Sequence, residues 1–219
     1  SLPASLRAER QGEIATLRLA RPEKRNALND ATVLGIEAFF RSLPDGIKVV
    51  IIDAEGPNFS AGLDLSELSE RSTVEGIAHS MMWHRAFEPV ELGRVPVVAV
   101  LKGAVVGGGL ELACAAHIRV AERGAYYALP EGQRGIFVGG GAAVRVPRLI
   151  GAARMADMML TGRVYDAETG QALPRIAEAN PREGFLLEAL MAAVAQGSDE
   201  AKERLRAFLE KRAKKVTEF

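Results

Sequence analysis

The chain has little of what defines the specialised classes of small protein. Its one cysteine cannot form an internal disulfide, and no Cys/His cluster has metal-ligand spacing, which excludes a disulfide scaffold and a zinc module. No apolar run approaches the roughly 20 residues that cross a bilayer, and the first residues lack the basic-then-apolar layout of a signal peptide. We therefore expect a cytoplasmic protein with no membrane partner and no metal.

Aromatic residues and net charge are low as well. Only 5% of the residues are aromatic, and 28 Lys and Arg balance 28 Asp and Glu, so neither a base-stacking platform nor a basic footprint is present. These two absences argue against nucleic acid as a partner. The 219 residues, with a hydrophobic content of 48%, are enough for a globular domain with an ordinary core.

Hydrophobic patterning predicts alternating strands and helices. Residues 14–19 alternate as in a half-buried strand, whereas 49–52 and 95–101 are continuous apolar runs typical of strands buried on both faces. Further strands are expected at 5–9, 118–121 and 126–129, and helices from Asn29 or Asp30 to Pro44, at 73–92, 107–116, 142–161 with a break at Gly151, and 200–215. This order predicts the α/β class with a largely parallel core.

Glycine is the residue in excess, and its triplets at 107–109 and 139–141 indicate a close approach of backbone to a ligand. Neither triplet belongs to a Gly-x-Gly-x-x-Gly or a Gly-Lys-Ser/Thr motif, which argues against a nucleotide site. His79, His84 and Glu88 have rough helical spacing but no third ligand elsewhere, which argues against a metal site.

The first triplet opens a helix, where backbone N–H groups have no internal partner and the helix dipole is positive. The N–H of Gly108 is therefore a candidate donor to a carbonyl oxygen that becomes negative during a reaction. Glu111 lies on the same helix face, although a glutamate there can also simply complement the dipole. With Ala61 as a second donor and Glu131 as a second carboxylate, the set suits proton transfer beside a carbonyl.

Five stretches of sequence, in order along residues 5 to about 169, form a specific combination although each alone is weak. They read Arg-Pro-Glu-Lys-Arg-Asn-Ala-Leu at 21–28, Phe-Ser-Ala-Gly-Leu-Asp-Leu at 59–65, Lys-Gly-Ala-Val-Val-Gly-Gly-Gly-Leu-Glu-Leu at 102–112, Pro-Glu at 130–131 and Leu-Thr-Gly-Arg at 160–163. Together they resemble the crotonase (enoyl-CoA hydratase/isomerase) superfamily, and most of all its enoyl-CoA hydratases. The resemblance implies a spiral of repeated ββα units with a C-terminal helical region.

The same resemblance implies a role for each matching residue. The N–H groups of Ala61 and Gly108 correspond to the oxyanion hole, and Glu111 and Glu131 to the pair that holds the water added across the C2=C3 bond of a 2-enoyl-CoA. Coenzyme A enters as part of the substrate, and no permanently bound cofactor is expected. The expected contacts with CoA and substrate are Lys24, Arg25, Ala27, Gly62, Asp64, Leu65, Gly107, Pro130, Gly139, Phe208 and Lys211.

One wall of the acyl pocket departs from the family. The family's hydratases usually carry a Pro-Gly-Ala-Gly-Gly-like stretch after the second glutamate, where this chain has Val-Gly-Gly-Gly at 138–141. The acyl group is therefore left open. A double-bond isomerase, a hydratase-lyase and a non-catalytic assembly protein on the same fold are the alternatives; retention of both glutamates favours hydration.

The end of the chain also differs from the family pattern. We expect a core domain at 1–165 with the CoA-thioester site and a C-terminal helical region at 166–219, which lacks a few dozen residues of the family pattern. The prediction is that residues 170 and 171 are not covalently adjacent; a continuous chain there would mean a natural deletion. The family's trimers and hexamers further imply a homotrimer or hexamer, with Phe208 and Lys211 near the CoA entrance.

Overall fold

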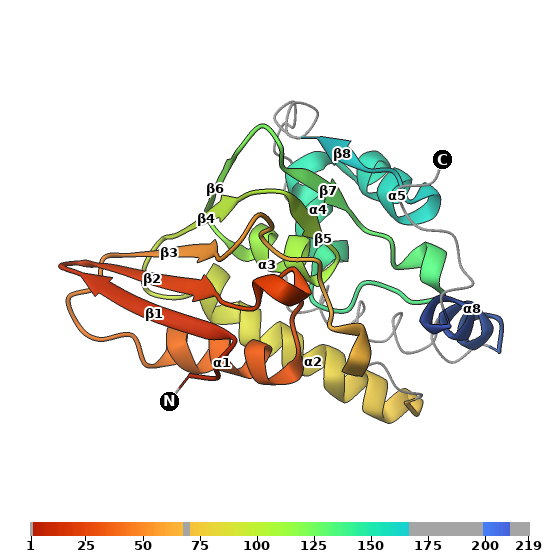
Figure 1. Cartoon of the computed structure of the whole chain (residues 1–219), viewed down its shortest axis with the longest axis horizontal. Helices are drawn as coiled ribbons and strands as arrows, with labels where there is room; N and C mark the ends of the chain where they lie inside the picture. The colour runs from red at the N-terminus through yellow and green to blue at the C-terminus, as the bar shows by residue number, and fades with distance from the viewer. Residues whose placement is uncertain (1, 68–70, 167–198, 211–219) are drawn as a thin grey trace.

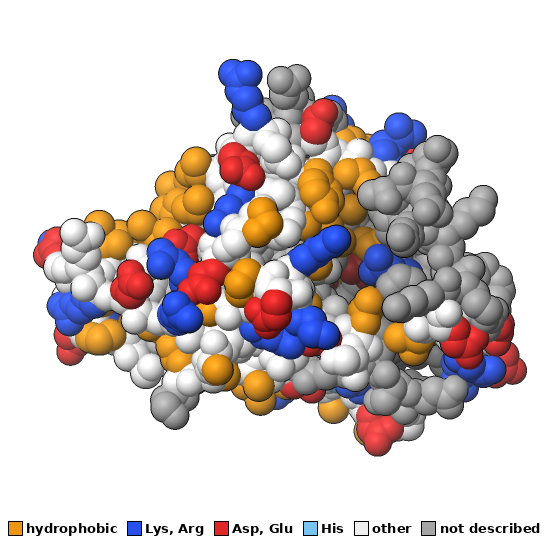
Figure 2. Space-filling view, in the orientation of Figure 1, with side chains coloured by type: hydrophobic (Ala, Val, Ile, Leu, Met, Phe, Trp, Pro, Cys, Tyr) orange, Lys and Arg blue, Asp and Glu red, His pale blue; other side chains and the backbone are white. Residues whose placement is uncertain are grey.

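The computed structural model describes residues 2–67, 71–166 and 199–210 (Figure 1). The predicted discontinuity at 170/171 and Lys211 lie outside these ranges, and the division into two regions at 165/166 stays a prediction. Within the described ranges, no helix has both the length and the apolar character needed to cross a bilayer. Basic and acidic side chains are interspersed over the face drawn in Figure 2.

A five-stranded sheet contains most of the strands that the hydrophobic pattern predicts. Its order is β1 (Leu6–Gln11), β2 (Ile14–Leu19), β3 (Val49–Ala54), β4 (Val97–Leu101) and β6 (Ile118–Ala121). β1 and β2 are antiparallel, and the other pairs are parallel. Leu17, Ile52 and Ala99 are paired in register and fully buried, so the period-2 pattern of β2 places its apolar side chains on the core face.

A second sheet of three strands consists of β5 (Ala104–Val106), β7 (Tyr126–Ala128) and β8 (Tyr165–Asp166). β4 and β5 belong to different sheets and are followed by α3 (Gly108–Ala115); β6 and β7 repeat this arrangement before α4 (Ala142–Ile150). The chain therefore advances by ββα units between two sheets, which confirms the predicted mixed α/β arrangement. β5 was not predicted, because three residues between two glycines are too few to display a strand period.

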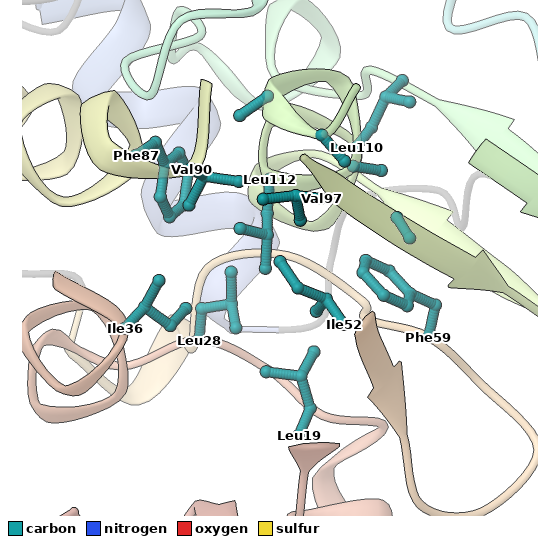
Figure 3. Packing of buried hydrophobic residues seen from close by; sticks show 14 of the residues in the cluster. Leu19, Leu28, Ile36, Ile52, Phe59, Phe87, Val90, Val97, Leu110 and Leu112 are labelled. Atoms are coloured by element: carbon teal, nitrogen blue, oxygen red, sulfur yellow. The ribbon is translucent and has the colours of Figure 1, made fainter. Parts of the chain in front are cut away.

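The core lies between the five-stranded sheet and the helices. α1 (Asp30–Arg41) packs against α2 (Thr73–Glu91), and α2 packs against α3. Figure 3 shows Ile36, Phe87 and Leu112, one from each of these helices, in the same buried cluster as Ile52 of β3. The side chain of Asn29 accepts a hydrogen bond from the N–H of Thr32, which decides between the two predicted caps of α1.

The helices after the second sheet follow the predicted break. α4 ends at Gly151, whose φ of +84° disfavours any other residue, and α5 (Ala152–Thr161) begins directly after it. α8 (Asp199–Leu209) contacts the short 3₁₀ turn Gly132–Arg134, on the segment between β7 and α4. The predicted helix at 200–215 is thus observed from its start to Leu209.

Candidate active site

Both predicted catalytic glutamates line one pocket. The space that they share has an empty volume of about 610 Å³, which includes open solvent at its mouth. The side of α2 that faces the pocket, the start of α3 and the segment after β7 form its walls. The lining residues are Leu63, Arg71, Gly76, His79, Ser80, Trp83, Gly108, Glu111, Glu131, Ile136, Phe137, Gly139 and Gly140.

The repeated ββα units bring these residues together. Ser60 forms a parallel bridge with Val105 of β5, and β5 is parallel to β7. The segments that follow Ser60, β5 and β7 therefore leave the second sheet at the same edge. Gly62 shows how closely they approach: a Cβ added to it would lie 2.7 Å from the carbonyl oxygen of Val106 and 3.1 Å from the nitrogen of Gly108. Gly62 also has φ = +90°, so no larger residue fits there without strain.

Glu111 is held by backbone donors at the closed end of the pocket. Only 3% of the residue is exposed, and its Oε1 accepts hydrogen bonds from the N–H groups of Gly140 (2.8 Å) and Ala142 (3.0 Å). Burial raises the pKa of Glu111, and the two N–H groups together with the Arg145 charge oppose that rise. These donors favour the ionised form of Glu111 over that of any neighbour without such partners.

The segment that binds Glu111 is itself fixed by two side chains that sequence analysis missed. The hydroxyl of Ser80 donates to the carbonyl of Gly139 at 2.6 Å, and the Arg145 guanidinium donates to the carbonyl of Gly140 at 2.9 Å. Arg145 also pairs with Glu91 of α2 at 2.8 Å. The sequence signal for this role is an arginine among the apolar residues of α4. The structure buries Arg145, and a buried charge needs partners.

Glu131 is the less well-partnered carboxyl of the two. Its Oε2 is buried and has no hydrogen-bond partner in the part of the chain that the structure describes. Burial, followed by the charge of Glu111, raises the pKa of Glu131 to about 8. Burial raises the pKa of both carboxyl groups, but Glu111 has two backbone N–H donors and Oε2 of Glu131 has no partner among the described residues, so the geometry favours a proton on Glu131.

The structure corrects one of the two predicted N–H donors. The N–H of Ala61 already donates to the carbonyl of Arg25 at 2.9 Å, so it is not available to a ligand. Leu63 is paired with Leu28 in a parallel β-bridge. The N–H of Leu28 donates to the carbonyl of Gly62, and the carbonyl of Leu28 accepts from the N–H of Asp64, so the bridge uses no backbone group of Leu63. The N–H of Leu63 makes no hydrogen bond to any described residue and lies 3.5 Å from where a Cβ on Gly108 would stand.

Gly108 keeps its predicted place. It is the first residue of α3, so its N–H has no partner within that helix. Its φ is not in the left-handed region, but a Cβ there would lie 2.6 Å from the Trp83 ring. Leu63 and Gly108, both of which line the pocket, therefore replace Ala61 and Gly108 as the pair of unengaged donors.

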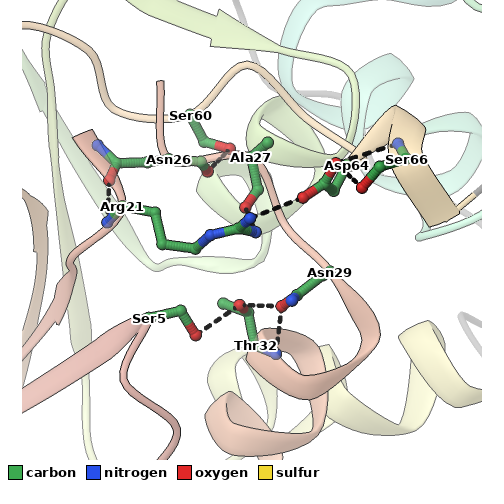
Figure 4. A network of polar contacts seen from close by, with 9 residues as sticks. All are labelled: Ser5, Arg21, Asn26, Ala27, Asn29, Thr32, Ser60, Asp64 and Ser66. Atoms are coloured by element: carbon green, nitrogen blue, oxygen red, sulfur yellow. Dashed lines mark hydrogen bonds and ion pairs between the residues drawn. The ribbon is translucent and has the colours of Figure 1, made fainter. Parts of the chain in front are cut away.

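The predicted CoA loop is linked to the segment that contains Leu63: the Arg21 guanidinium donates to the carbonyl of Ala27 and pairs with Asp64 (Figure 4). Asn26, with φ = +53° and 2% exposure, donates to the carbonyls of Glu55 and Asn58 and ties the loop to the segment before Ser60. Lys24 and Arg25 are exposed and Ala27 is half-buried, as a binding loop requires. The order of the loop depends on Asn26, which sequence analysis did not single out; the signal is an asparagine in a polar loop, a residue that tolerates left-handed backbone.

The side chain of Asp64 has its partners within the protein, and its contact with CoA stays a prediction. Its carboxylate is buried, pairs with Arg21 at 2.9 Å and accepts from the backbone and hydroxyl of Ser66. Although burial opposes it, these hydrogen bonds and the Arg21 charge together lower the pKa of Asp64. The Asp64 side chain thus links its own segment to the loop that contains Arg21, and it does not line the pocket.

Comparison with known proteins decides the family. Residues 9–218 match the family described as "Enoyl-CoA hydratase/isomerase". The chain belongs to this family. It is 38% identical over 170 residues to the fatty acid oxidation complex subunit alpha of Shewanella loihica, covering 76% of this chain and 24% of that protein. It is 31% identical over 163 residues to the short-chain-enoyl-CoA hydratase of Clostridium acetobutylicum, covering 73% of this chain and 62% of that protein.

A solved structure supports the same assignment. The crystal structure of a candidate enoyl-CoA hydratase from Rhodopseudomonas palustris is 51% identical, has a TM-score of 0.76 and matches 95% of both chains. This likeness confirms the crotonase-type fold. The chain spans less than two thirds of the length of the first two curated relatives, about a quarter in one case and 62% in the other.

The remaining predicted contacts of this crotonase-family chain fall into two groups. Gly107, Pro130 and Gly139 lie on the segments that form the pocket. Leu65 is half-buried, two residues after Leu63. Phe208 is within α8, but its side chain is not among those that the structure describes. Contact of Phe208 and Lys211 with CoA stays a prediction, and so does the homotrimer or hexamer.

The pH dependence of stability tests the protonation state of Glu131. Its pKa is about 8 in the folded chain against an ordinary 4.5, so between these pH values the folded chain binds more protons than the unfolded chain. The stability that this proton contributes is fully present below about pH 4.5 and is lost as pH rises to about 8, by up to about 1.4 kcal/mol per pH unit. Denaturant unfolding at the two ends of this window measures the loss.

The variant Glu131→Gln removes this proton exchange. We expect its free energy of unfolding to exceed that of the wild type most at the alkaline end, with the difference shrinking toward acid pH. Glu13→Gln, at an exposed glutamate outside the pocket, is the control and should leave the pH dependence unchanged. An equal difference at both ends would contradict a proton held on Glu131.

Proposed function

We propose that the chain is a hydratase that adds water across the C2=C3 double bond of a 2-enoyl-CoA thioester. The observation that carries the proposal is the carboxyl pair: Glu111 is fixed by two backbone N–H groups, whereas Glu131 is buried with an unpartnered oxygen and a pKa of about 8. Two carboxyl groups whose environments separate their protonation states suit one base and one acid. The curated name of the Clostridium relative supports the same substrate class.

In this proposal the thioester lies at the donor pair. Its carbonyl oxygen accepts hydrogen bonds from the N–H groups of Leu63 and Gly108, which stabilise the negative charge that develops on that oxygen. With the carbonyl there, C2 and C3 lie beside the two glutamates. Coenzyme A then extends along the loop of Lys24, Arg25 and Ala27, where the two exposed cations meet its phosphates.

The chemical step follows from the protonation states. A water between the two carboxyl groups loses a proton to Glu111 as its oxygen bonds to C3. The electron pair of the double bond moves toward C2 and the thioester, and C2 takes the proton of Glu131. The product is a 3-hydroxyacyl-CoA; Glu111 ends protonated and Glu131 ionised, and proton exchange restores the starting state. No metal or resident cofactor takes part in this scheme.

Double-bond isomerisation is the alternative to be separated from hydration. It moves a proton between two carbons and consumes no water, so one carboxyl group is enough. The assay is the loss of the conjugated-thioester absorbance of crotonyl-CoA, with the product identified by mass spectrometry. We expect a product heavier by one water; a product of unchanged mass would assign isomerisation, and unchanged absorbance across enoyl-CoA thioesters of several lengths would exclude the hydratase.

A further inference from the structure

One face of α2 runs from the pocket into the core. Gly76, Ser80, Trp83 and Phe87 are three or four residues apart and share this face. Gly76 is half-buried and lines the pocket, Trp83 is 4% exposed and also lines it, and Phe87 is fully buried in the core. Trp83 is therefore the residue at which the pocket ends and the core begins.

The indole ring closes the reactive end of the pocket. The edge of its six-membered ring lies 2.6 Å from where a Cβ on Gly108 would stand and 3.0 Å from the corresponding point on Gly140. Gly108 supplies a proposed N–H donor to the thioester, and Gly140 supplies an N–H to Glu111. Both glycines are thus in direct contact with the ring, and so is any acyl carbon placed between them.

Two neighbouring side chains hold the indole ring in place. Trp83 packs edge-to-face on Phe87, with ring centroids 5.6 Å apart and planes at 73°. On its other side it contacts His79, whose Nε2 is within 2.8 Å of Asp30 of α1. The indole is therefore packed between a core aromatic ring and a side chain bound to a second helix. A substrate could displace it only at a cost in packing energy.

We propose that Trp83 is a specificity-determining residue that restricts the acyl group to short chains. The inference rests on the proposed hydratase function, because the reactive carbons must reach the closed end beside Gly108 and Glu111. Carbons beyond C3 then meet the indole ring. One methylene that does not fit is worth roughly a tenfold or greater discrimination in kcat/KM.

The test compares kcat/KM for crotonyl-CoA and trans-2-decenoyl-CoA. The wild type is expected to prefer crotonyl-CoA, and Trp83→Leu to move the ratio toward decenoyl-CoA by roughly tenfold or more. Trp83→Phe, which removes less volume, should fall between them. Val90→Ala is the matched control: it loosens the same helix in the core about two turns beyond Trp83, leaves Phe87 in place and does not line the pocket, so the ratio should stay as in the wild type.

A binding measurement keeps the inference testable without turnover. Trp83 is the single tryptophan of the chain, so intrinsic fluorescence reports on this ring alone. Titration of the wild type with butyryl-CoA should change the emission at lower concentrations than decanoyl-CoA does, and CoA without an acyl group should change it least.

The outcomes separate this inference from the function on which it rests. An active wild type that prefers decenoyl-CoA, or a folded Trp83→Leu variant with an unchanged ratio, would overturn the role of Trp83 and leave hydration standing. Unchanged fluorescence with butyryl-CoA would do the same. A wild type whose fluorescence responds to butyryl-CoA but that hydrates no enoyl-CoA would refute the hydratase while supporting Trp83 as the acyl contact.

Discussion

Replacing Glu131 with glutamine is expected to lower kcat for crotonyl-CoA hydration by roughly 10²–10⁴-fold, the range of a general acid or base. Glutamine keeps the shape of the side chain but cannot deliver the proton that C2 requires. Glu111→Gln should cost a similar factor, because the amide cannot take the proton from water. An absorbance assay at saturating substrate measures both variants.

The stability of these variants separates chemistry from folding. Glu131→Gln should be at least as stable as the wild type at alkaline pH, since the amide cannot ionise in a buried position that raises the pKa of the carboxyl. A more stable protein with far lower turnover would be hard to explain by misfolding. Glu13→Gln is again the matched control and should retain full activity. Turnover of Glu131→Gln within a few-fold of the wild type would refute its role as the acid.

Gly108→Ala is expected to reduce kcat by roughly 10²–10³-fold, the effect of losing one oxyanion donor. The added Cβ would lie 2.6 Å from the Trp83 ring, so either the indole or the start of α3 must move. Any shift of α3 moves the N–H away from the thioester oxygen, whose charge grows only as the reaction proceeds. The loss should therefore appear in kcat more than in KM.

Two further variants decide whether the cause is the collision with Trp83. Gly124→Ala is the matched control, because its Cβ would meet nothing nearer than a Glu122 oxygen at 3.8 Å, and its activity should be that of the wild type. The double variant Gly108→Ala/Trp83→Leu removes the opposing ring and should recover part of the loss. Additive losses in the double variant would mean that the steric account of Gly108 is wrong.

Much of the fold and the two carboxyl groups were predictable from the sequence because their signals are local. The alternation of Ala15, Leu17 and Leu19 defines a strand face, and Asn29 caps the helix that follows it, each within a few residues. Gly108 and Glu111 lie within one helical turn. The family motifs add Glu131, which lies in the same pocket as Glu111.

The choice of the donor and the walls of the pocket depend on contacts between distant segments. Ala61 and Leu63 look equally suitable in sequence, and only the carbonyl of Arg25 on another loop engages one N–H and leaves the other available. Ser80, Arg145 and Trp83 acquire their roles when α2 packs against α3 and the segment after β7. Sequence patterns determined which elements form and which acids are present. Only tertiary packing decided which backbone groups remain unpaired, which carboxyl keeps the proton and where the pocket ends, because hydrogen-bond partners, burial and excluded volume are supplied by residues far apart in the chain.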